Sequence, residues 1–364
     1  MADRYSEYRK VAHNMGVDAV ALVPGPNFTR LFDASFHSHE RPLLVFIPVN
    51  GLPAAIVPNL ELRSFDLLNF EGEVFDWRDQ VGYSGAFEAL TAKMPLSSLA
   101  VEGQVMRVFV HHALKAAYPD LAIIDAEKEI SILRMIKSDD DLAKMERAIK
   151  ISESALTDVL AHVQIGMTEK HIERLLTQAL FSHGAEELAF GPIVAAGDNS
   201  ARPHAQARFD YEIQDGDALL IDFGARYQGF CADITRTVFV GSVTGAARDV
   251  YDTVLRANLR GHEITRAGIT AHEIDDEVTK VLEASPYADR IRTKTGHGLG
   301  RDVHETPYIV RGNHQVLDAG TVYTNEPGLY KRGTFGVRTE DDVLVTENGC
   351  RSLTTFPKEL MVVG

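Results

Sequence analysis

The feature that most constrains the fold is an internal repeat in the second half of the chain. Gly166-Met167-Thr168 and Gly268-Ile269-Thr270 each precede a segment with apolar residues at helical spacing. The apolar positions, at the same offsets in both copies, are Ile172, Leu176, Ala179 and Leu180, and Ile274, Val278, Val281 and Leu282. A long amphipathic segment comes before each copy, at residues 142–163 and 246–264, and apolar strand-like segments follow. We therefore expect two related helix-helix-strand units packed about a pseudo-twofold axis, with a site between their sheets.

The chain before this repeat alternates short apolar runs with helical patterns and predicts a small α/β domain. The expected strands are residues 43–47, 54–57, 99–102 and 122–125, with a helix near 105–117. Asn50-Gly51 lies between the first two strands and is typical of a β-hairpin turn. Because 364 residues exceed the usual size of one core, we expect two domains, at residues 1–130 and 131–364.

Two helix starts can be read directly from the sequence. Ser138 is followed by three aspartates, which suit the positive end of a helix dipole and predict a solvated first turn. Thr270 and Glu273 have the spacing of a capping box. Both positions should therefore begin long helices of the repeated units.

Charge and composition exclude several classes of function. The net charge of −15 argues against nonspecific nucleic-acid binding, which needs a basic surface. The N-terminus has no apolar signal core, and the longest apolar run, residues 43–49, is too short to cross a bilayer. Two cysteines imply no disulfide framework. We expect a cytoplasmic protein without a membrane or nucleic-acid partner.

Five potential metal ligands are spread over the last two-fifths of the chain. They are Asp222, Asp233, His297, Glu326 and Glu340. Four carboxylates and one neutral imidazole balance two divalent cations, and oxygen-rich sites suit manganese, cobalt or zinc. Some carboxylates must bridge and water must complete the coordination, because five side chains cannot fill two shells. A water shared by two cations loses a proton near neutral pH, so the sequence suggests a two-metal hydrolase.

Each of these motifs also has an ordinary structural interpretation. Asp222 and Asp233 stand on apolar segments joined by a turn at 225–229, and burying both without a cation would be costly. The alternative is a salt bridge, for example with Arg236, or exposure on an edge strand. For Glu340 the alternative is surface acidity, since two aspartates follow it.

Glycines on both sides of His297 let the backbone approach a ligand. A nucleotide-binding loop is the competing interpretation, but no P-loop lysine follows. His262-Glu263 lacks the second histidine of a zincin motif, so we expect both residues on a helix surface. Cys231 shares a strand face with Asp233 and is expected to be a small packed thiol.

The order and flanks of the five residues resemble the metal-dependent Xaa-Pro peptidases. The flanks are Asp233-Ile234-Thr235-Arg236-Thr237, Gly296-His297-Gly298-Leu299-Gly300, Val303-His304-Glu305-Thr306-Pro307 and Glu326-Pro327-Gly328. That group comprises Xaa-Pro dipeptidase (prolidase) and Xaa-Pro aminopeptidase, and is related to methionine aminopeptidase. The resemblance runs from about Ile130 to the C-terminus. It implies an α/β (α+β) fold, in which a small creatinase/prolidase-type domain precedes a pseudo-twofold pita-bread catalytic domain.

The resemblance also implies roles for individual residues. Asp233 and Glu340 would bridge the two metals, and Glu326 would be both a ligand and the proton carrier. His204 and His304 match the histidines that contact the scissile carbonyl and stabilise the oxyanion. Arg338 would support the metal carboxylates. Relatives commonly carry tyrosine where this chain has Phe230, so a hydroxyl contribution is lost there.

The predicted activity is hydrolysis of the Xaa-Pro bond of dipeptides or short peptides, through a hydroxide that bridges two divalent ions. Mn²⁺ or Co²⁺ are the first candidates and Zn²⁺ is a further one. The resemblance alone implies a homodimer, and it leaves dipeptidase and aminopeptidase preference open. Alternative functions are hydrolysis of another amide or C–N bond on the same fold, methionine aminopeptidase-like action, or non-catalytic binding.

Overall fold

The protein is described by a computed structural model that covers residues 3–37 and 39–364. The chain divides into two compact units, Met1–Arg134 and Met135–Gly364. Within the described ranges, no helix is both long enough and apolar enough to span a membrane.

The first unit is built on one six-stranded sheet with strand order β4-β3-β2-β1-β5-β6. Its strands are β1 (Ala19–Leu22), β2 (Leu44–Pro48), β3 (Ala54–Pro58), β4 (Glu73–Trp77), β5 (Ser98–Val101) and β6 (Ala122–Asp125). Its helices are α1 (Ser6–Met15), α2 (Pro26–Phe32), η1 (Asn59–Glu61), α3 (Leu62–Asp66), α4 (Ser84–Lys93), α5 (Val108–Ala117), α6 (Glu127–Ser131) and η2 (Ile132–Arg134). The predicted hairpin is confirmed, because β2 and β3 pair antiparallel. The predicted strands on either side of α5 are confirmed too, and they pair parallel as β5 and β6.

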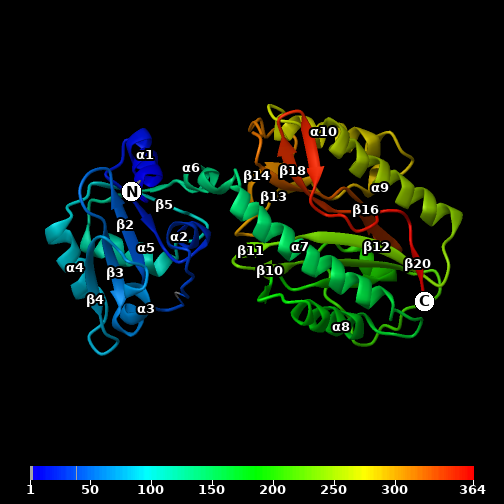
Figure 1. Cartoon of the computed structure of the whole chain (residues 1–364), viewed down its shortest axis with the longest axis horizontal. Coiled ribbons are helices and arrows are strands. Elements are labelled where there is room, and N and C mark those ends of the chain that lie inside the picture. Colours follow the sequence, from blue (N-terminus) through cyan, green and yellow to red (C-terminus); the bar gives the residue numbers. More distant parts are fainter. Residues whose placement is uncertain (1–2, 38) are drawn as a thin grey trace. The chain divides into compact units, whose positions relative to one another are not determined.

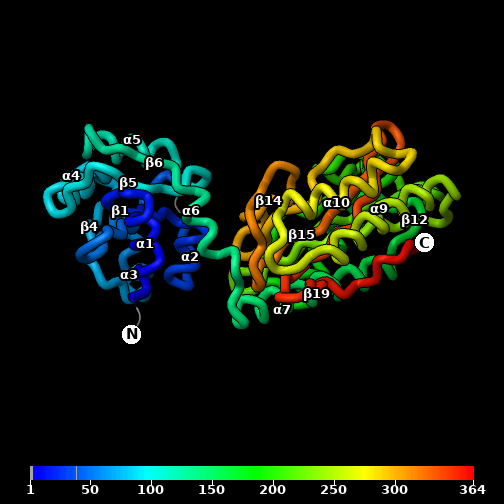
Figure 2. Tube along the Cα trace, turned by 90° about the horizontal axis from the view of Figure 1, so that it is seen from above, coloured from blue at the N-terminus to red at the C-terminus, as the bar shows by residue number. Residues whose placement is uncertain are grey.

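Alternate side chains of the central strands enter two different cores. Val20 and Val45 pack against α1, α2 and α3, whereas Ala21 and Phe46 pack against α4 and α5. Figure 2 shows these two groups of helices on opposite faces of the sheet. Because both faces are covered, these strands read as continuous apolar runs rather than alternating ones.

The second unit contains four long helices around two larger sheets. The helices are α7 (Asp139–Leu160), α8 (Glu169–Ser182), α9 (Gly245–Ile264) and α10 (Ala271–Glu283), with the short η3 (Gly197–Ala201) and η4 (Ala288–Arg290). The strands are β7 (Glu187–Leu188), β8 (Ile193–Ala196), β9 (Ala218–Phe223), β10 (Ala225–Tyr227), β11 (Phe230–Cys231), β12 (Ile234–Val240), β13 (Gly296–Gly298), β14 (Glu305–Ile309), β15 (Val322–Asn325), β16 (Gly328–Lys331), β17 (Phe335–Arg338), β18 (Asp341–Thr346), β19 (Gly349–Ser352) and β20 (Val362–Val363). The larger sheets have the orders β20-β12-β9-β8 and β14-β13-β15-β18-β19.

The internal repeat appears in the structure as two matching sets of backbone hydrogen bonds. The N–H of Gly166 donates to Ile213, whose own N–H donates back to Met167, both at 2.9 Å. In the second copy, the N–H of Gly268 donates to the carbonyl of Leu317, and the N–H of Leu317 donates back to Ile269, again both at 2.9 Å. Both glycines have positive φ, 88° and 86°, a conformation that strains other residues. The repeat inferred from apolar spacing is therefore confirmed at the level of backbone geometry.

Each helix pair covers one side of the sheets. Helices α7 and α8 share a core with β8, β9 and β12, while α9 and α10 share one with β15 and β18. Figure 1 shows the first pair along one side of the strands and the second pair along the other. The capping boxes at Ser138 and Thr270 are both formed, which confirms the predicted starts of α7 and α10. The strand ends between the helix pairs are thereby held in place for the site.

Helix α8 depends on its N-cap, and this dependence can be tested. The Thr168 hydroxyl accepts from the His171 N–H at 3.2 Å, so Thr168→Ala should destabilise the second unit by about 1 kcal/mol. Urea denaturation followed by circular dichroism measures the loss. Thr168→Ser keeps the hydroxyl and should retain most of the stability. An equal loss in both variants would contradict a capping role.

Candidate metal centre

Strand pairing brings Asp222 and Asp233 onto one face of a sheet. Asp222 lies on β9 directly opposite Thr235 of β12, and Asp233 precedes Thr235 by two residues. Paired residues and residues two apart point to the same face, so all three side chains face the same way. The connection is not the simple turn expected from the sequence. It contains the small hairpin β10–β11, which pairs with β7.

The other three predicted ligands come from the second sheet and its connections. His297 is the central residue of β13, Glu326 follows β15, and Glu340 lies between β17 and β18. The Glu340 N–H donates to the Thr235 carbonyl at 3.1 Å, and the Thr235 hydroxyl donates to the Glu340 carboxylate. These bonds tie Glu340 to the sheet that carries the two aspartates.

The ligand atoms of the five residues converge. Together with His304 they form three overlapping groups, within each of which the candidate atoms lie within 4.8 Å of one another. The groups are Asp233, His297 and His304; His297, Glu326 and Glu340; and Asp222, Asp233 and Glu340. His297 Nε2 lies 3.3 Å from Glu326 Oε1 and 3.7 Å from Asp233 Oδ2. The two sheets thus bring together residues that are more than a hundred positions apart in the sequence, such as Asp222 and Glu340.

The charges at this site favour bound cations. Burial raises the pKa of Asp233 and Glu340 well above their usual range, and neighbouring carboxylates raise both further. Burial also raises the pKa of Asp222, although Arg338 opposes the shift. Asp222 Oδ1 is buried without a hydrogen-bond donor in the described part of the chain. Uncompensated buried carboxylates are costly, so the residues present fit divalent cations.

His297 is held in the orientation that a metal ligand needs. Its Nδ1 faces the Gly298 carbonyl at 3.1 Å, so in the neutral ring Nδ1 carries the proton and donates it there. Nε2 then faces the carboxylates, where a bound cation would take its lone pair. Burial would raise the pKa of Glu326, but the influence of His297, Arg338 and Lys294 together outweighs burial and holds that pKa below its usual value.

Arg338 is the positive side chain that contacts the carboxylates directly. Its Nη2 pairs with Asp222, and its Nε lies 3.9 Å from Glu340 and 4.0 Å from Glu326. Nη1 donates to the Tyr330 hydroxyl at 2.8 Å, which fixes the guanidinium plane. The alternative salt bridge with Arg236 does not form, because Arg236 points to a different acid.

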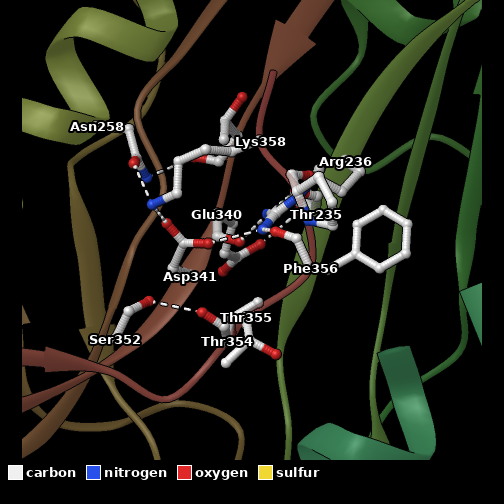
Figure 3. Close-up of polar contacts among 12 residues, drawn as sticks. Thr235, Arg236, Asn258, Glu340, Asp341, Ser352, Thr354, Thr355, Phe356 and Lys358 are labelled. Atoms are coloured by element: carbon white, nitrogen blue, oxygen red, sulfur yellow. Dashed lines mark hydrogen bonds and ion pairs between the residues drawn. The ribbon is translucent and has the colours of Figure 1, made fainter. Parts of the chain in front are cut away.

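Arg236 and Asp341 form a buried ionic network behind the site (Figure 3). Both side chains are fully buried, and Arg236 donates to Asp341 at 2.8 Å and to the Glu340 carbonyl at 2.6 Å. It also donates to the carbonyl of Phe356 at 2.7 Å. Figure 3 shows Asp341 between Arg236 and the ammonium of Lys358. The network fixes the backbone on which Glu340 stands.

One alternative is excluded here and one expectation from the sequence is wrong. The alternative of surface acidity at residues 340–342 is excluded, since all three side chains are buried. The expected surface position of His262 is wrong, because its Nε2 lies 3.0 Å from Asp341 and it also contacts Cys350. The segments that cover His262 are distant in sequence, so no local pattern indicated them.

The remaining predicted residues lie around this centre. His304 is exposed, and its ring centroid lies 4.0 Å from that of His297. The pKa of His304 is lowered to about 4. Partial burial is the largest cause, the charge of neighbouring His297 is the second, and His204 adds a smaller contribution. His204 is exposed in the turn after η3 and belongs to none of the three ligand groups.

Cys231 and Phe230 are packing residues. Cys231 is fully buried, and burial raises its pKa to about 12, as expected for a packed thiol. The Phe230 ring is buried with the Arg301 guanidinium 4.4 Å from its centroid. Sequence reasoning missed Thr235 and Tyr330. Strand alternation from Asp233 could have indicated Thr235, whereas nothing local indicated Tyr330.

The fold and the converging ligands define a protein of the metallohydrolase class. Residues 143–347 match metallopeptidase family M24, and residues 4–136 match the creatinase/prolidase N-terminal domain. The chain belongs to metallopeptidase family M24. Both the resemblance and the fold class expected from the sequence are thereby confirmed.

Named relatives and solved structures agree with this assignment. An Xaa-Pro dipeptidase of Pyrococcus horikoshii is 32% identical over 349 residues, 95% of each chain. The prolidase structure from Thermococcus sibiricus matches with a TM-score of 0.92 and 30% identity over 100% of both chains. An X-Pro aminopeptidase structure from Thermotoga maritima matches with a TM-score of 0.84 and 30% identity, again over 100% of both.

The buried network gives a stability prediction. Asp341→Asn leaves the Arg236 guanidinium buried without its counter-charge, which should lower the free energy of unfolding by about 3–5 kcal/mol. Urea denaturation measures the difference. Asp276→Asn is the matched control, since Asp276 pairs with the exposed side chains of Lys280 and Arg311, and it should change little. Equal effects of the two substitutions would show that the buried pair has no special role.

Proposed function

We propose that this chain is a dinuclear-metal exopeptidase that hydrolyses the Xaa-Pro bond of dipeptides or short peptides. The observation that carries the proposal is the convergence of Asp222, Asp233, His297, Glu326 and Glu340 in a member of family M24. The bond type is inferred from the names of the relatives and similar structures, which are Xaa-Pro dipeptidase, prolidase and X-Pro aminopeptidase.

The overlap of the three ligand groups supports a two-ion arrangement. Asp233, His297 and Glu340 each belong to two groups, and of these three only the carboxylates of Asp233 and Glu340 offer two oxygens with which to bridge a pair of ions. Two divalent cations held there, Mn²⁺ or Co²⁺ first and Zn²⁺ as a further candidate, would lower the pKa of a shared water and make it nucleophilic at neutral pH. Arg338 holds Asp222 in position for this ligand set.

The protein's own side chains then handle protons and charge. Glu326 accepts the proton of the attacking water and delivers it to the leaving proline nitrogen. His304 lies beside His297 and donates to the scissile carbonyl oxygen, where negative charge develops. His204, which contributes to lowering the pKa of His304, assists at the same carbonyl oxygen.

The nature of the bond suits such a site. The nitrogen of an Xaa-Pro bond carries no hydrogen, so a peptidase that reads an amide N–H has no contact to make. Activation by cations and histidines acts on the carbonyl and needs no such N–H. A homodimer and a cytoplasmic location belong to the same proposal, and they rest on the resemblance to the family alone.

Metal removal tests the proposed function directly. Treatment with a chelator should abolish cleavage of Xaa-Pro dipeptides, and addition of Mn²⁺, Co²⁺ or Zn²⁺ should restore it. Release of proline, measured by chromatography, is the readout. Longer Xaa-Pro peptides assayed in parallel separate dipeptidase from aminopeptidase action. Undiminished cleavage by the fully demetallated protein would refute the proposal.

Asp233→Ala tests the bridging role. Turnover should fall by well over a hundredfold, more than the roughly 10–100-fold typical of groups that only support metal ligands. Added metal should raise the melting temperature of the wild-type protein but not that of the variant. Asp249→Ala, at an exposed position on α9, is the control. Wild-type turnover and metal response in Asp233→Ala would remove Asp233 from the ligand set.

A further inference from the structure

We propose that Lys294 binds the terminal carboxylate of the substrate and thereby gives the enzyme a preference for dipeptides. This inference rests on the proposed function and goes beyond it, because it assigns a specificity-determining residue. Lys294 was not singled out by any sequence motif. It becomes visible only from its place beside the metal-ligand residues.

The backbone places Lys294 next to the site. Lys294 immediately precedes Thr295, whose carbonyl accepts from the Glu326 N–H at 2.7 Å. His297 of β13 is directly paired with Tyr308 of β14. Directly paired residues of antiparallel strands project from the same face, so the Tyr308 ring lies on the face that carries His297.

The side chain of Lys294 is directed towards that face. Its Nζ lies 5.6 Å from the centroid of the Tyr308 ring, within the range of a cation–π contact. The charge of Lys294 also contributes to lowering the pKa of both Glu326 and His304, so the ammonium lies near both groups.

This ammonium has no counter-charge among the described residues. Its Nζ lies within 4.0 Å of no carboxylate in that part of the chain, whereas Lys137 and Lys358 of the same unit are each paired with an acid. Lys294 is half-buried, so a ligand can reach it while the surroundings weaken its hydration. A carboxylate is the ligand that such a group binds best.

The chemistry of a dipeptide supplies that carboxylate close to the scissile bond. In an Xaa-Pro dipeptide the free carboxylate is attached to the proline ring that contains the leaving nitrogen. A longer peptide has a neutral amide at this position and continues beyond it. An ammonium beside Glu326 and His304 would therefore favour the dipeptide through charge.

Steady-state kinetics on a matched substrate pair tests the inference. The substrates are Ala-Pro and its C-terminal amide, which differ only in the charge of that group, assayed with the Mn²⁺-loaded protein. Lys294→Met removes the charge and keeps most of the apolar stem. It should raise the KM for Ala-Pro about tenfold, the scale of one charge-assisted hydrogen bond, and leave the KM for the amide unchanged.

Two further variants make the result specific. Lys294→Arg keeps the charge and should preserve most of the preference for Ala-Pro. Lys280→Met, on the exposed face of α10, should change neither substrate. A structural or purely electrostatic role of Lys294 at Glu326 would alter kcat for both substrates to the same extent. Such a parallel loss, or equal KM values for the two substrates in the wild-type protein, would overturn the inference.

The same data separate this inference from the proposed function. Wild-type protein that cleaves both substrates without preference retains the proposed function and loses only the role of Lys294. If the wild-type protein cleaves neither substrate with any of the three metals, the proposed Xaa-Pro activity is refuted, and the proposed role of Lys294 is refuted with it.

Discussion

The mutual repulsion of buried carboxylates is the constraint on which the catalytic unit depends. Asp222, Asp233, Glu326 and Glu340 converge around one imidazole, and Arg338 is the only arginine or lysine within ion-pair distance of them in the described part of the chain. Such a cluster persists only if the scaffold holds it and cations complete it. The repulsion between these carboxylates is therefore the feature that would supply affinity for divalent cations.

Two sets of contacts hold the carboxylates in place. One set binds their side chains directly, and the other binds the backbone behind them. Thr235 joins the two sheets, because its carbonyl and hydroxyl both bond Glu340 while its strand partner is Asp222. Behind it, Arg236 and Asp341 neutralise each other in full burial and bind the Glu340 backbone. One arginine serves the ligand side chains and the other serves the backbone that carries them. Neither arginine can replace the other. Neighbouring residues of a strand face opposite sides, so Arg236 points away from the face of β12 on which Thr235 meets Arg338.

Much of this arrangement could be predicted from the sequence where local rules decide the outcome. Equal spacing of apolar residues indicated the repeat. Ser138 with its three following aspartates indicated where α7 begins, and the capping pair Thr270–Glu273 indicated where α10 begins. The partners of Arg236 and Arg338 could not be predicted, because charge alone does not choose between several acids. Burial of Asp341 and His262 was missed for a related reason. Their cover includes Lys358 in the C-terminal segment, which has no strand or helix signal of its own.

Substrate choice has to come from residues outside the metal ligands. The chain is equally similar in sequence to the prolidase and the X-Pro aminopeptidase structures, and it covers all of both. Fold and ligand set therefore do not decide the length of the peptide. A charge at the edge of the site does, because a dipeptide and a longer peptide differ there by a full negative charge. Lys294 stands at that edge beside Glu326, in the segment just before β13, where the Thr295 carbonyl accepts from Glu326 and the Thr295 N–H donates to Asp275. These bonds hold the backbone that carries the ammonium, which lowers the conformational entropy lost on contact with a carboxylate.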